Sequence, residues 1–288
     1  MDEFDIPRPF NSEEFEVFQK GISDNSSIDV YINERRDFLF LYPTPRTDYN
    51  DYTPRVKKYG LSGYKKKLQV IQRRLDKIEH LLENRPYSLL EIGAGDAGFL
   101  KIVRQSMPKI HLTAVDKDQN TVHDRIRNAD ENYDDLEELQ VKSRCYDFIC
   151  LFHVLEHLLS PSDFFAKICR IMSSTSVLII EVPSFCDPLL SLYENQAYSK
   201  FYFQSQHPYV YSPSSLQRLM EHNGFQTVDL INYQRYGFEN HLNWLSQGRP
   251  GGNDVFQQLF SELEIDYIEA LEKHGKTDTV IWVGKAAN

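Results

Sequence analysis

The sequence predicts an α/β protein whose parallel sheet is covered by helices on both faces. Three observations predict this class: strand and helix patterns alternate from residue 87 onward, the strand patterns are almost continuously apolar, and a glycine-rich turn follows the first of them. The chain has 288 residues, which is enough for one elaborated domain with a substantial core.

The first predicted helix precedes this alternation. Apolar residues recur at steps of four and three from Tyr64 to Leu82, with Lys and Arg between them, and Pro86 ends the pattern. Residues 1–55, before this helix, are acidic and aromatic and are interrupted by prolines. We therefore expect an irregular lobe or lid in that part of the chain.

The alternating pattern itself begins after Pro86. Strands are expected at 87–92, 110–115, 146–152 and 176–182. Helices are expected between them, at about 97–106 and 162–172. Near-continuous hydrophobicity is typical of strands buried on both sides, so these strands should form the centre of the sheet.

The last third of the sequence adds further elements. A capped helix that ends at Gly224 leads into a strand. Residues 233–253 are polar and aromatic and are expected to be a loop insertion. A helix over 254–275 and a closing strand over 279–284 complete the chain.

Composition narrows the class of partner. The net charge of −10 argues against a nucleic-acid partner, because polyanions bind basic surfaces. The cysteines lie in or beside apolar runs without a Cys-x-x-Cys pair, as in proteins with reduced thiols. The first residues lack the pattern of a signal peptide and no apolar run is long enough to span a membrane, so we expect a cytoplasmic protein.

The glycine-rich turn reads Glu-Ile-Gly-Ala-Gly-Asp-Ala-Gly over residues 91–98. Glycines let the backbone pass close to a ligand that side chains would block. The spacing of Gly93, Gly95 and Gly98 also matches a dinucleotide fingerprint. Glycine spacing alone therefore leaves the ligand open.

Two acidic residues distinguish the possible ligands. Glu91 stands just before the first glycine, where a carboxylate would repel a pyrophosphate and attract an ammonium group. Asp116 ends the second strand, where an acidic side chain can hold the hydroxyls of a ribose. An amino acid joined to a ribose indicates S-adenosylmethionine rather than NAD.

Four motifs together resemble the class I S-adenosylmethionine-dependent methyltransferases: LLEIGAGDAGFL, AVDKD, YDFICLFHVLEHLLSP and VLIIEVPS. The likeness covers about residues 87–232 and is greatest to the small-molecule branch with sugar and ubiquinone-pathway enzymes. It implies a Rossmann-like seven-stranded sheet with helices on both faces. It also implies an N-terminal aromatic lid at 1–62 and a methyltransferase domain at 63–288, with an acceptor insertion at about 233–253.

The resemblance implies a set of cofactor-binding residues. The methionine portion would be lined by Glu91, Gly93, Ala94, Gly95 and Asp96. Asp116 would hold the ribose, and Asp135 is the candidate beside the adenine, although the third strand is poorly marked. Phe152 and His153 at the end of the strand over 146–152 complete the set. S-adenosylhomocysteine would be the product.

A histidine and carboxylate cluster follows the strand over 146–152. If a helix starts near His153, then His153, Glu156 and His157 share one face of it. A histidine suits the removal of a proton from a hydroxyl that is being methylated. With His207 as a distant fourth member, the same residues could instead hold a divalent metal, although we do not expect one. A third interpretation is that Glu156 and His157 only brace the loop.

The acceptor is expected to meet residues that resemble those of related methyltransferases. His207 is the candidate general base, with Tyr209 and Tyr211 lining the same pocket. Further candidates are the lid tyrosines and the polar residues of the insertion: Tyr49, Tyr52, Asn240, His241, Trp244 and Arg249.

The most specific functional expectation is O-methylation of a small-molecule acceptor, a sugar or a metabolite of a glycan pathway. N- or C-methylation of a nucleotide-linked sugar is one alternative, because an amine that is already neutral needs little base. A non-catalytic module that keeps the cofactor site is another. An NAD-linked dehydrogenase is disfavoured by Glu91.

Overall fold

The computed structural model describes residues 6–45, 61–82, 87–141, 144–251 and 254–287. The chain divides into two units, each made of separate stretches of sequence. The first unit contains residues Met1–Thr47, Leu155–Ser162 and Glu181–Trp282. The second unit contains residues Asp48–Val154, Asp163–Ile180 and Val283–Asn288.

A seven-stranded sheet has the order β10-β11-β8-β7-β4-β5-β6. This confirms the α/β class and the seven-stranded Rossmann-like sheet expected from the sequence. The chain runs from β4 to β5 and β6 on one side and to β7 on the other, so strand order reverses between β4 and β7. Ligands of such sheets bind beyond the carboxyl ends of the strands at that reversal.

Most strands of this sheet match the expected segments, but β6 was not expected and β8 begins four residues before the predicted 176–182. Their bounds are β4 Ser88–Ile92, β5 His111–Val115, β6 Glu131–Tyr133, β7 Tyr146–Phe152, β8 Met172–Pro183, β10 Phe225–Tyr233 and β11 Thr279–Ala286. β4 pairs in parallel with β5 and with β7, and Leu89, Leu90, Ile149 and Cys150 are fully buried or nearly so. Burial on both faces explains why the central strands β4 and β7 are apolar at most positions.

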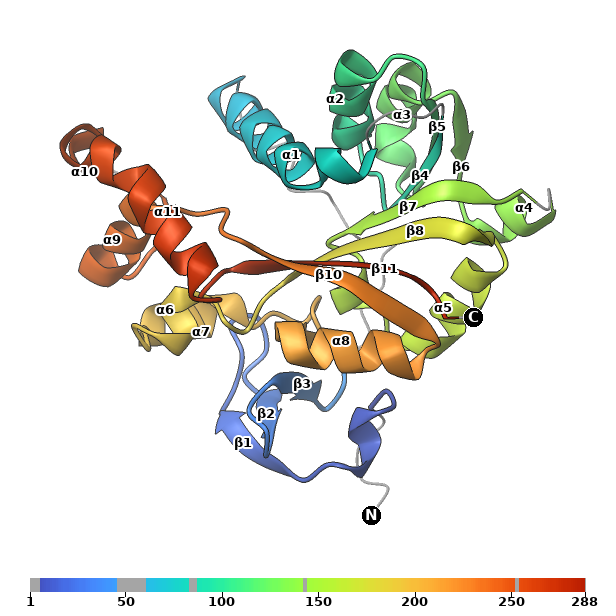
Figure 1. Ribbon diagram of the computed structural model, residues 1–288. Helices are drawn as coiled ribbons and strands as arrows, with labels where there is room; N and C mark the ends of the chain where they lie inside the picture. The colour runs from blue at the N-terminus through green and yellow to red at the C-terminus, as the bar shows by residue number, and fades with distance from the viewer. Residues whose placement is uncertain (1–5, 46–60, 83–86, 142–143, 252–253, 288) are drawn as a thin grey trace. The chain divides into compact units, whose positions relative to one another are not determined.

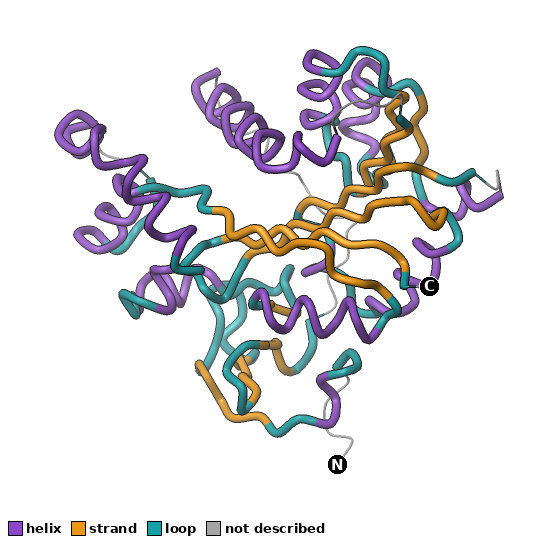
Figure 2. The backbone as a smooth tube through the Cα atoms, in the orientation of Figure 1, coloured by secondary structure: helices purple, strands orange, loops and turns teal. Residues whose placement is uncertain are grey.

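Helices alternate with the strands of the second unit (Figure 2). They are α1 Leu61–Leu82, α2 Gly98–Ser106, α3 Val122–Asn128, α4 Leu136–Val141 and α5 Pro161–Cys169, with a 3-10 turn η4 at Gln119–Thr121. α1 packs against α2, and α2 packs against α3 and β5. Figure 1 shows α1, α2 and α3 on the same face of the strands β4 to β7.

The first unit contains a four-stranded antiparallel sheet that the sequence did not predict. Its order is β1-β2-β3-β9, with β1 Phe15–Gln19, β2 Asp29–Asn33, β3 Phe38–Tyr42 and β9 Tyr209–Tyr211. The expectation of an irregular lobe over 1–55 is therefore wrong for the described part of that segment. The prolines lie outside the three strands, and β9, the partner of β3, lies far along the chain, where local patterns give no sign of it.

One helix of the first unit lies in the segment that was expected to be a loop insertion. The helices of this unit are η1 Phe10–Ser12, η5 Leu155–His157, α6 Pro188–Ser191, α7 Gln196–Tyr202, α8 Pro213–His222, α9 Phe238–Gln247, α10 Asp254–Phe260, η6 Ser261–Leu263 and α11 Glu264–Lys273. The segment 233–253, expected to be a loop, contains α9, which ends at Gly248 in a left-handed conformation with φ +62°. The helix expected over 254–275 is interrupted by η6.

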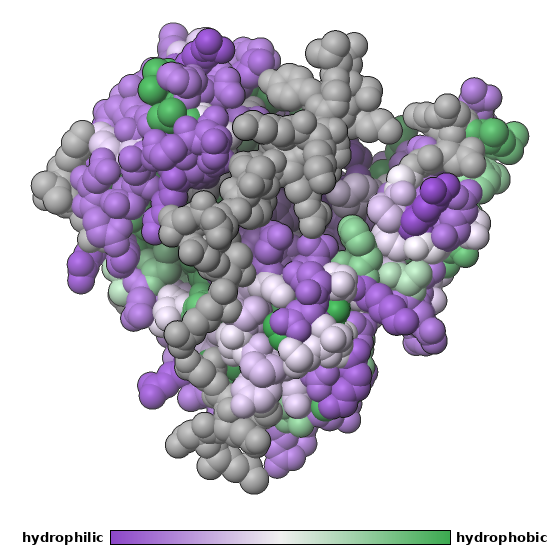
Figure 3. All heavy atoms as spheres, turned by 180° about the vertical axis from the view of Figure 1, so that it is seen from behind, coloured by the Kyte–Doolittle hydropathy of each residue, from purple (hydrophilic) through white to green (hydrophobic). Residues whose placement is uncertain are grey.

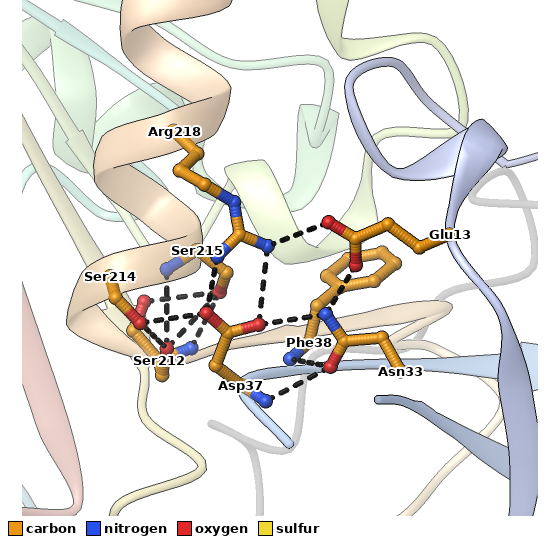
Figure 4. A network of polar contacts seen from close by, with 8 residues as sticks. All are labelled: Glu13, Asn33, Asp37, Phe38, Ser212, Ser214, Ser215 and Arg218. Carbon is orange, nitrogen blue, oxygen red and sulfur yellow. Dashed lines mark hydrogen bonds and ion pairs between the residues drawn. The ribbon is translucent and has the colours of Figure 1, made fainter. Parts of the chain in front are cut away.

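A polar network joins the N-terminal strands to α8 within the first unit (Figure 4). Asp37 accepts hydrogen bonds from Arg218, from Asn33 at 2.8 Å and from Ser214 at 2.9 Å. Arg218 also donates to Glu13 at 3.2 Å. Burial alone would raise the pKa of Asp37, but the hydrogen bonds from Arg218, Asn33 and Ser214 outweigh it, so the pKa lies below its ordinary value.

The surface seen in Figure 3 is largely hydrophilic, with smaller apolar patches, and several exposed apolar residues lie on α10. Exposed apolar side chains there and in the following turn include Val255, Leu259 and Leu263. Within the described part of the chain, the helices are too short or too polar to cross a lipid bilayer.

Candidate functional site

The glycine turn joins β4 to α2 and is fixed by hydrogen bonds to the end of β5. The Gly93 and Ala94 N–H groups both donate to the Val115 carbonyl oxygen, at 2.8 and 3.2 Å. Gly93 has φ +73°, and a β-carbon there would lie 2.3 Å from Cγ2 of Val154. Both the backbone conformation and the lack of space therefore require glycine at this position.

Glu91 is the buried carboxylate of this turn, only 4 % exposed at the end of β4. Burial raises its pKa to about 8, with a smaller rise from Asp96 and Asp116 and an opposing effect of Arg74. Its Oε2 atom has no hydrogen-bond partner among the described residues. A buried carboxylate with an unsatisfied oxygen fits a ligand that brings a positive charge and N–H donors.

Asp96 and Asp116 accept hydrogen bonds from backbone N–H groups in and next to the glycine turn. Asp116 Oδ2 accepts the Gly95 N–H at 2.7 Å, and its Oδ1 accepts the Asp118 N–H at 2.7 Å. Asp96 Oδ1 accepts the Gly98 N–H at 3.1 Å at the start of α2, and its Oδ2 forms an ion pair with Lys67 at 2.6 Å. Each carboxylate oxygen can accept a second hydrogen bond, so these contacts leave capacity for a ligand.

The third strand, β6, is short and ends at Tyr133. Asp135 lies just beyond it and accepts the Glu138 N–H at 3.1 Å at the start of α4. Arg125, which the sequence did not indicate, is fully buried beside these residues. It donates to the Asp118 carbonyl oxygen at 2.7 Å and to Asn132 at 2.7 Å. These two hydrogen bonds hold the loop after β5 next to β6.

Arg74 of α1 is a second residue that the sequence analysis missed. It is 8 % exposed, and its guanidinium carbon lies 4.4 Å from the ring centroid of Phe152. Its positive charge also opposes the rise in the pKa of Glu91. The signal was present, because Ile71, Arg74 and Ile78 are spaced at three and four residues and share the buried face of the helix.

His153 does not share a helical face with Glu156 and His157, so that expectation is wrong. It follows β7 with φ +58°, a conformation that a non-glycine residue rarely adopts, and the 3-10 turn η5 begins only at Leu155. Phe152, just before it, is 7 % exposed and packs edge-on against Phe99, with ring centroids 4.7 Å apart.

Glu156, His157 and His207 lie together in the first unit. One ligand atom from each is within 4.8 Å of the other two. The His157 and His207 ring centroids are 4.8 Å apart, and Nδ1 of His157 donates to the Gln206 carbonyl oxygen at 2.7 Å. Glu156 is 1 % exposed, whereas both histidines are half-buried. The structure therefore brings three of the four expected members of the cluster together.

The family is shown by a match to a family model, and the similar solved structures share the fold. The family model described as "Methyltransferase domain" matches residues 64–230, more than half of the chain. The chain belongs to this methyltransferase family. The expectation of an S-adenosylmethionine-dependent methyltransferase is thereby confirmed. No match was found among curated proteins.

Three solved structures are similar to this methyltransferase. A SAM-dependent methyltransferase from Archaeoglobus fulgidus is 19 % identical, with 76 % of this chain and 94 % of that chain covered and a TM-score of 0.50. A chain of the complex between the Haloferax volcanii Trm112 methyltransferase activator and a putative methyltransferase is 12 % identical, with coverage of 79 % and 96 % and a TM-score of 0.52. The plantazolicin methyltransferase BpumL, in complex with a triazolic analog and SAH, is 16 % identical, with coverage of 83 % and 88 % and a TM-score of 0.49.

The expected acceptor tyrosines of the methyltransferase are packed in its core. Tyr209 and Tyr211 of β9 are 2 % and 0 % exposed and pack against Phe38, with ring centroids 6.0 and 5.6 Å away. The Tyr209 hydroxyl donates to the Leu159 carbonyl oxygen at 3.3 Å. Tyr49 and Tyr52 lie outside the described residues.

Of the four acceptor-binding candidates in and beside α9, two are buried, one is half-buried and one is exposed. Trp244 is 3 % exposed and packs edge-on against Tyr198, with ring centroids 5.0 Å apart. His241 is 1 % exposed, Nδ1 hydrogen-bonds with the Tyr267 hydroxyl at 2.7 Å, and burial lowers its pKa to about 4. Asn240 is half-buried and donates to the Gly251 carbonyl oxygen at 3.2 Å, and Arg249 is exposed.

Proposed function

We propose that this enzyme methylates a hydroxyl group of a small-molecule acceptor, a sugar or a metabolite of a glycan pathway. The observation that carries this proposal is the pair of imidazoles in the Glu156–His157–His207 cluster. A hydroxyl must lose its proton as it attacks a methyl group, and histidine is the side chain best suited to accept a proton near neutral pH. The sequence resemblance to sugar methyltransferases supports the class of acceptor.

The residues of the glycine turn fit the donor. When bound, S-adenosylmethionine supplies an electrophilic methyl group on a sulfonium centre, and S-adenosylhomocysteine is the product. In this proposal Glu91 receives the ammonium group, because its buried Oε2 has no hydrogen-bond partner among the described residues. The backbone at Gly93 to Gly95 lies against the methionine portion, and Asp116 accepts hydrogen bonds from the ribose.

The cluster in the first unit prepares the acceptor. The Gln206 carbonyl can only accept a hydrogen bond, so Nδ1 of His157 carries the proton of that ring and Nε2 carries the lone pair. His207 is the general base in this proposal, and the adjacent His157 ring and the buried carboxylate of Glu156 position it. The proton passes from the acceptor hydroxyl to the imidazole of His207.

The proposal is tested by identifying the atom of the acceptor that receives the methyl group, and N- or C-methylation is the alternative outcome. Labelled S-adenosylmethionine is incubated with the enzyme and a panel of free and nucleotide-linked hexoses, and the product is analysed for methyl ethers. Donor binding is measured separately by calorimetry with S-adenosylhomocysteine. We expect an O-methyl product, and His207→Ala should lower turnover by about 10²- to 10⁴-fold with donor binding intact. An N-methyl or C-methyl product, or full turnover of His207→Ala, would contradict the proposal.

A further inference from the structure

We infer that Glu156, His157 and His207 bind a divalent transition-metal cation of the Zn²⁺ type. These residues belong to one unit of the chain, and one ligand atom from each lies within 4.8 Å of the others. The catalytic role of this cation rests on the proposed function. When the cation is bound, His207 is a ligand and no longer accepts the proton; the cation would instead make the acceptor hydroxyl acidic enough to lose its proton to solvent.

The donor set suits such a cation. Two imidazole nitrogens and one carboxylate oxygen are the ligands of many catalytic zinc and iron sites, which leave further coordination positions open. Mg²⁺ and Ca²⁺ prefer sites built from oxygen atoms alone. Two neutral imidazoles and one carboxylate leave a net positive charge on the site, so an acceptor hydroxyl at an open position would lose its proton more readily.

The orientation of His157 is the one that metal-binding histidines usually have. Its Nδ1–H donates to the Gln206 carbonyl oxygen at 2.7 Å, which directs the lone pair to Nε2, the remaining ring nitrogen. Gln206 directly precedes His207, whose own N–H donates to the Gln204 carbonyl oxygen at 2.9 Å. One turn therefore orients the first histidine and supplies the second.

The surroundings of Glu156 strengthen electrostatic interactions at the site. The side chain is 1 % exposed on η5, so its carboxylate attracts a cation in a region of low dielectric constant. The nearby Tyr211 hydroxyl is fully buried and has no hydrogen-bond partner among the described residues.

The distances require only a small adjustment. Ligand atoms about 2.1 Å from a tetrahedral cation lie roughly 3.4 Å apart. The ligand atoms, which lie within 4.8 Å of one another, therefore have to approach by at most roughly 1.4 Å, a shift of the size that side-chain rotation produces. His153 is not needed, because three protein ligands with open positions are typical of catalytic sites.

Titration with Co²⁺ tests this inference independently of turnover. Co²⁺ bound by nitrogen and oxygen ligands in a site of low coordination number absorbs visible light, so binding is followed by spectroscopy and by calorimetry. The full-length enzyme is compared with His207→Ala, Glu156→Gln and the control His222→Ala, which replaces an exposed histidine of α8 in the same unit. Thermal unfolding of each variant shows whether it is folded.

We expect one Co²⁺ per chain, competed by Zn²⁺, with affinity at least about tenfold weaker in His207→Ala and Glu156→Gln and unchanged in His222→Ala. If Glu156→Gln fails to fold, the half-buried His207 still decides the question. Equal binding by all four proteins, or no binding at millimolar Co²⁺, would overturn the inference.

The same samples separate this inference from the proposed function. Loss of turnover in His207→Ala without any cation binding would reject the metal site and keep His207 as the base. Cation binding by an enzyme that forms no O-methyl product would support the site and reject the proposed function.

Discussion

A β-carbon on Gly93 would lie 2.3 Å from Cγ2 of Val154, the residue that follows His153 after the end of β7. The glycine turn and the segment after β7 thus touch where the two central strands end. This contact fixes how closely the turn can approach the rest of the second unit.

Gly93→Ala should therefore destabilise the protein more than Gly95→Ala. Both residues have positive φ, which costs an alanine about 1–2 kcal/mol. Only at Gly93 does the new methyl group meet a neighbour, since no heavy atom lies within 4 Å of a β-carbon at Gly95. We expect an additional loss of about 1–3 kcal/mol for Gly93→Ala in urea denaturation. Equal losses for the two variants would contradict the close contact.

Glu91→Gln should flatten the pH dependence of stability. The pKa of Glu91 is about 8 in the folded protein, above its unfolded value of about 4.3. The stability that the raised pKa of Glu91 contributes is fully present below the unfolded pKa and is lost as pH rises toward 8. The free energy of unfolding falls over this range by up to about 1.4 kcal/mol per pH unit. The free energy of unfolding of the wild type and of Glu91→Gln, measured from pH 5 to 8, should diverge in favour of the variant as pH rises.

The exposed Glu138 of α4 provides a control, because Glu138→Gln should leave the pH profile unchanged. Glu91→Gln should also weaken binding of S-adenosylhomocysteine by about 10- to 100-fold, as expected from the loss of a charged hydrogen bond. Parallel pH profiles of Glu91→Gln and wild type would show that Glu91 ionises normally in the fold.

Asp37→Asn should weaken the attachment of the N-terminal strands to α8. Asp37 accepts hydrogen bonds from Arg218, Asn33 and Ser214, and its pKa is lowered in the folded protein. We expect a loss of about 1–3 kcal/mol at pH 7. Because the contribution is present above the unfolded pKa and is lost as pH falls through the folded one, the difference should shrink in acid.

Urea denaturation at pH 7 and at pH 3 measures this difference. Asp229→Asn, at an exposed position of β10 in the same unit, is the comparison and should have little effect. A difference between wild type and Asp37→Asn that stays constant from pH 7 to pH 3 would argue against the ion pair.

Trp244→Ala should strongly destabilise the protein, whereas Arg249→Ala should leave its stability almost unchanged. Trp244 is 3 % exposed and packs against Tyr198 and Phe201, so its truncation should cost about 3–5 kcal/mol. Arg249 is exposed and its guanidinium contacts only Gln247 among the described side chains, so its truncation should change stability by less than about 0.5 kcal/mol. A rise in the KM for the acceptor in Arg249→Ala would support acceptor binding; an unchanged KM would argue against it.

The parallel sheet and its turn could be predicted because their signals are local. The strand expected at 146–152 is Tyr146–Phe152, since a strand buried on both faces is apolar at nearly every position. The glycines of the turn are explained by backbone angles and by the contact with Val154, which leave a mark on the sequence at the position itself.

The features that the sequence did not predict have several physical causes. The pairing of β9 with β3 joins segments far apart in the sequence and leaves no local sign, whereas β1, β2 and β3 pair consecutively, and the apolar run Phe38–Tyr42 could have indicated a strand. Arg74 is one of the basic residues between the apolar positions of the predicted helix, although its spacing from Ile71 places it on the buried face. His153 was placed on a helix because sequence spacing does not reveal its positive φ. The assignment of site residues to cofactor and acceptor stays a prediction.

The pairing of β3 with β9 has a consequence for biosynthesis. The β3 segment Phe38–Tyr42 is entirely apolar or aromatic, and one of its two edges pairs with Tyr209–Tyr211. At a translation rate of about 5–20 residues per second, the ribosome needs roughly 10 to 30 s to reach these residues after completing β3. During that time an uncovered apolar strand edge is exposed to other chains. A nascent chain that stalls before Tyr209 would therefore be a natural client of ribosome-associated chaperones.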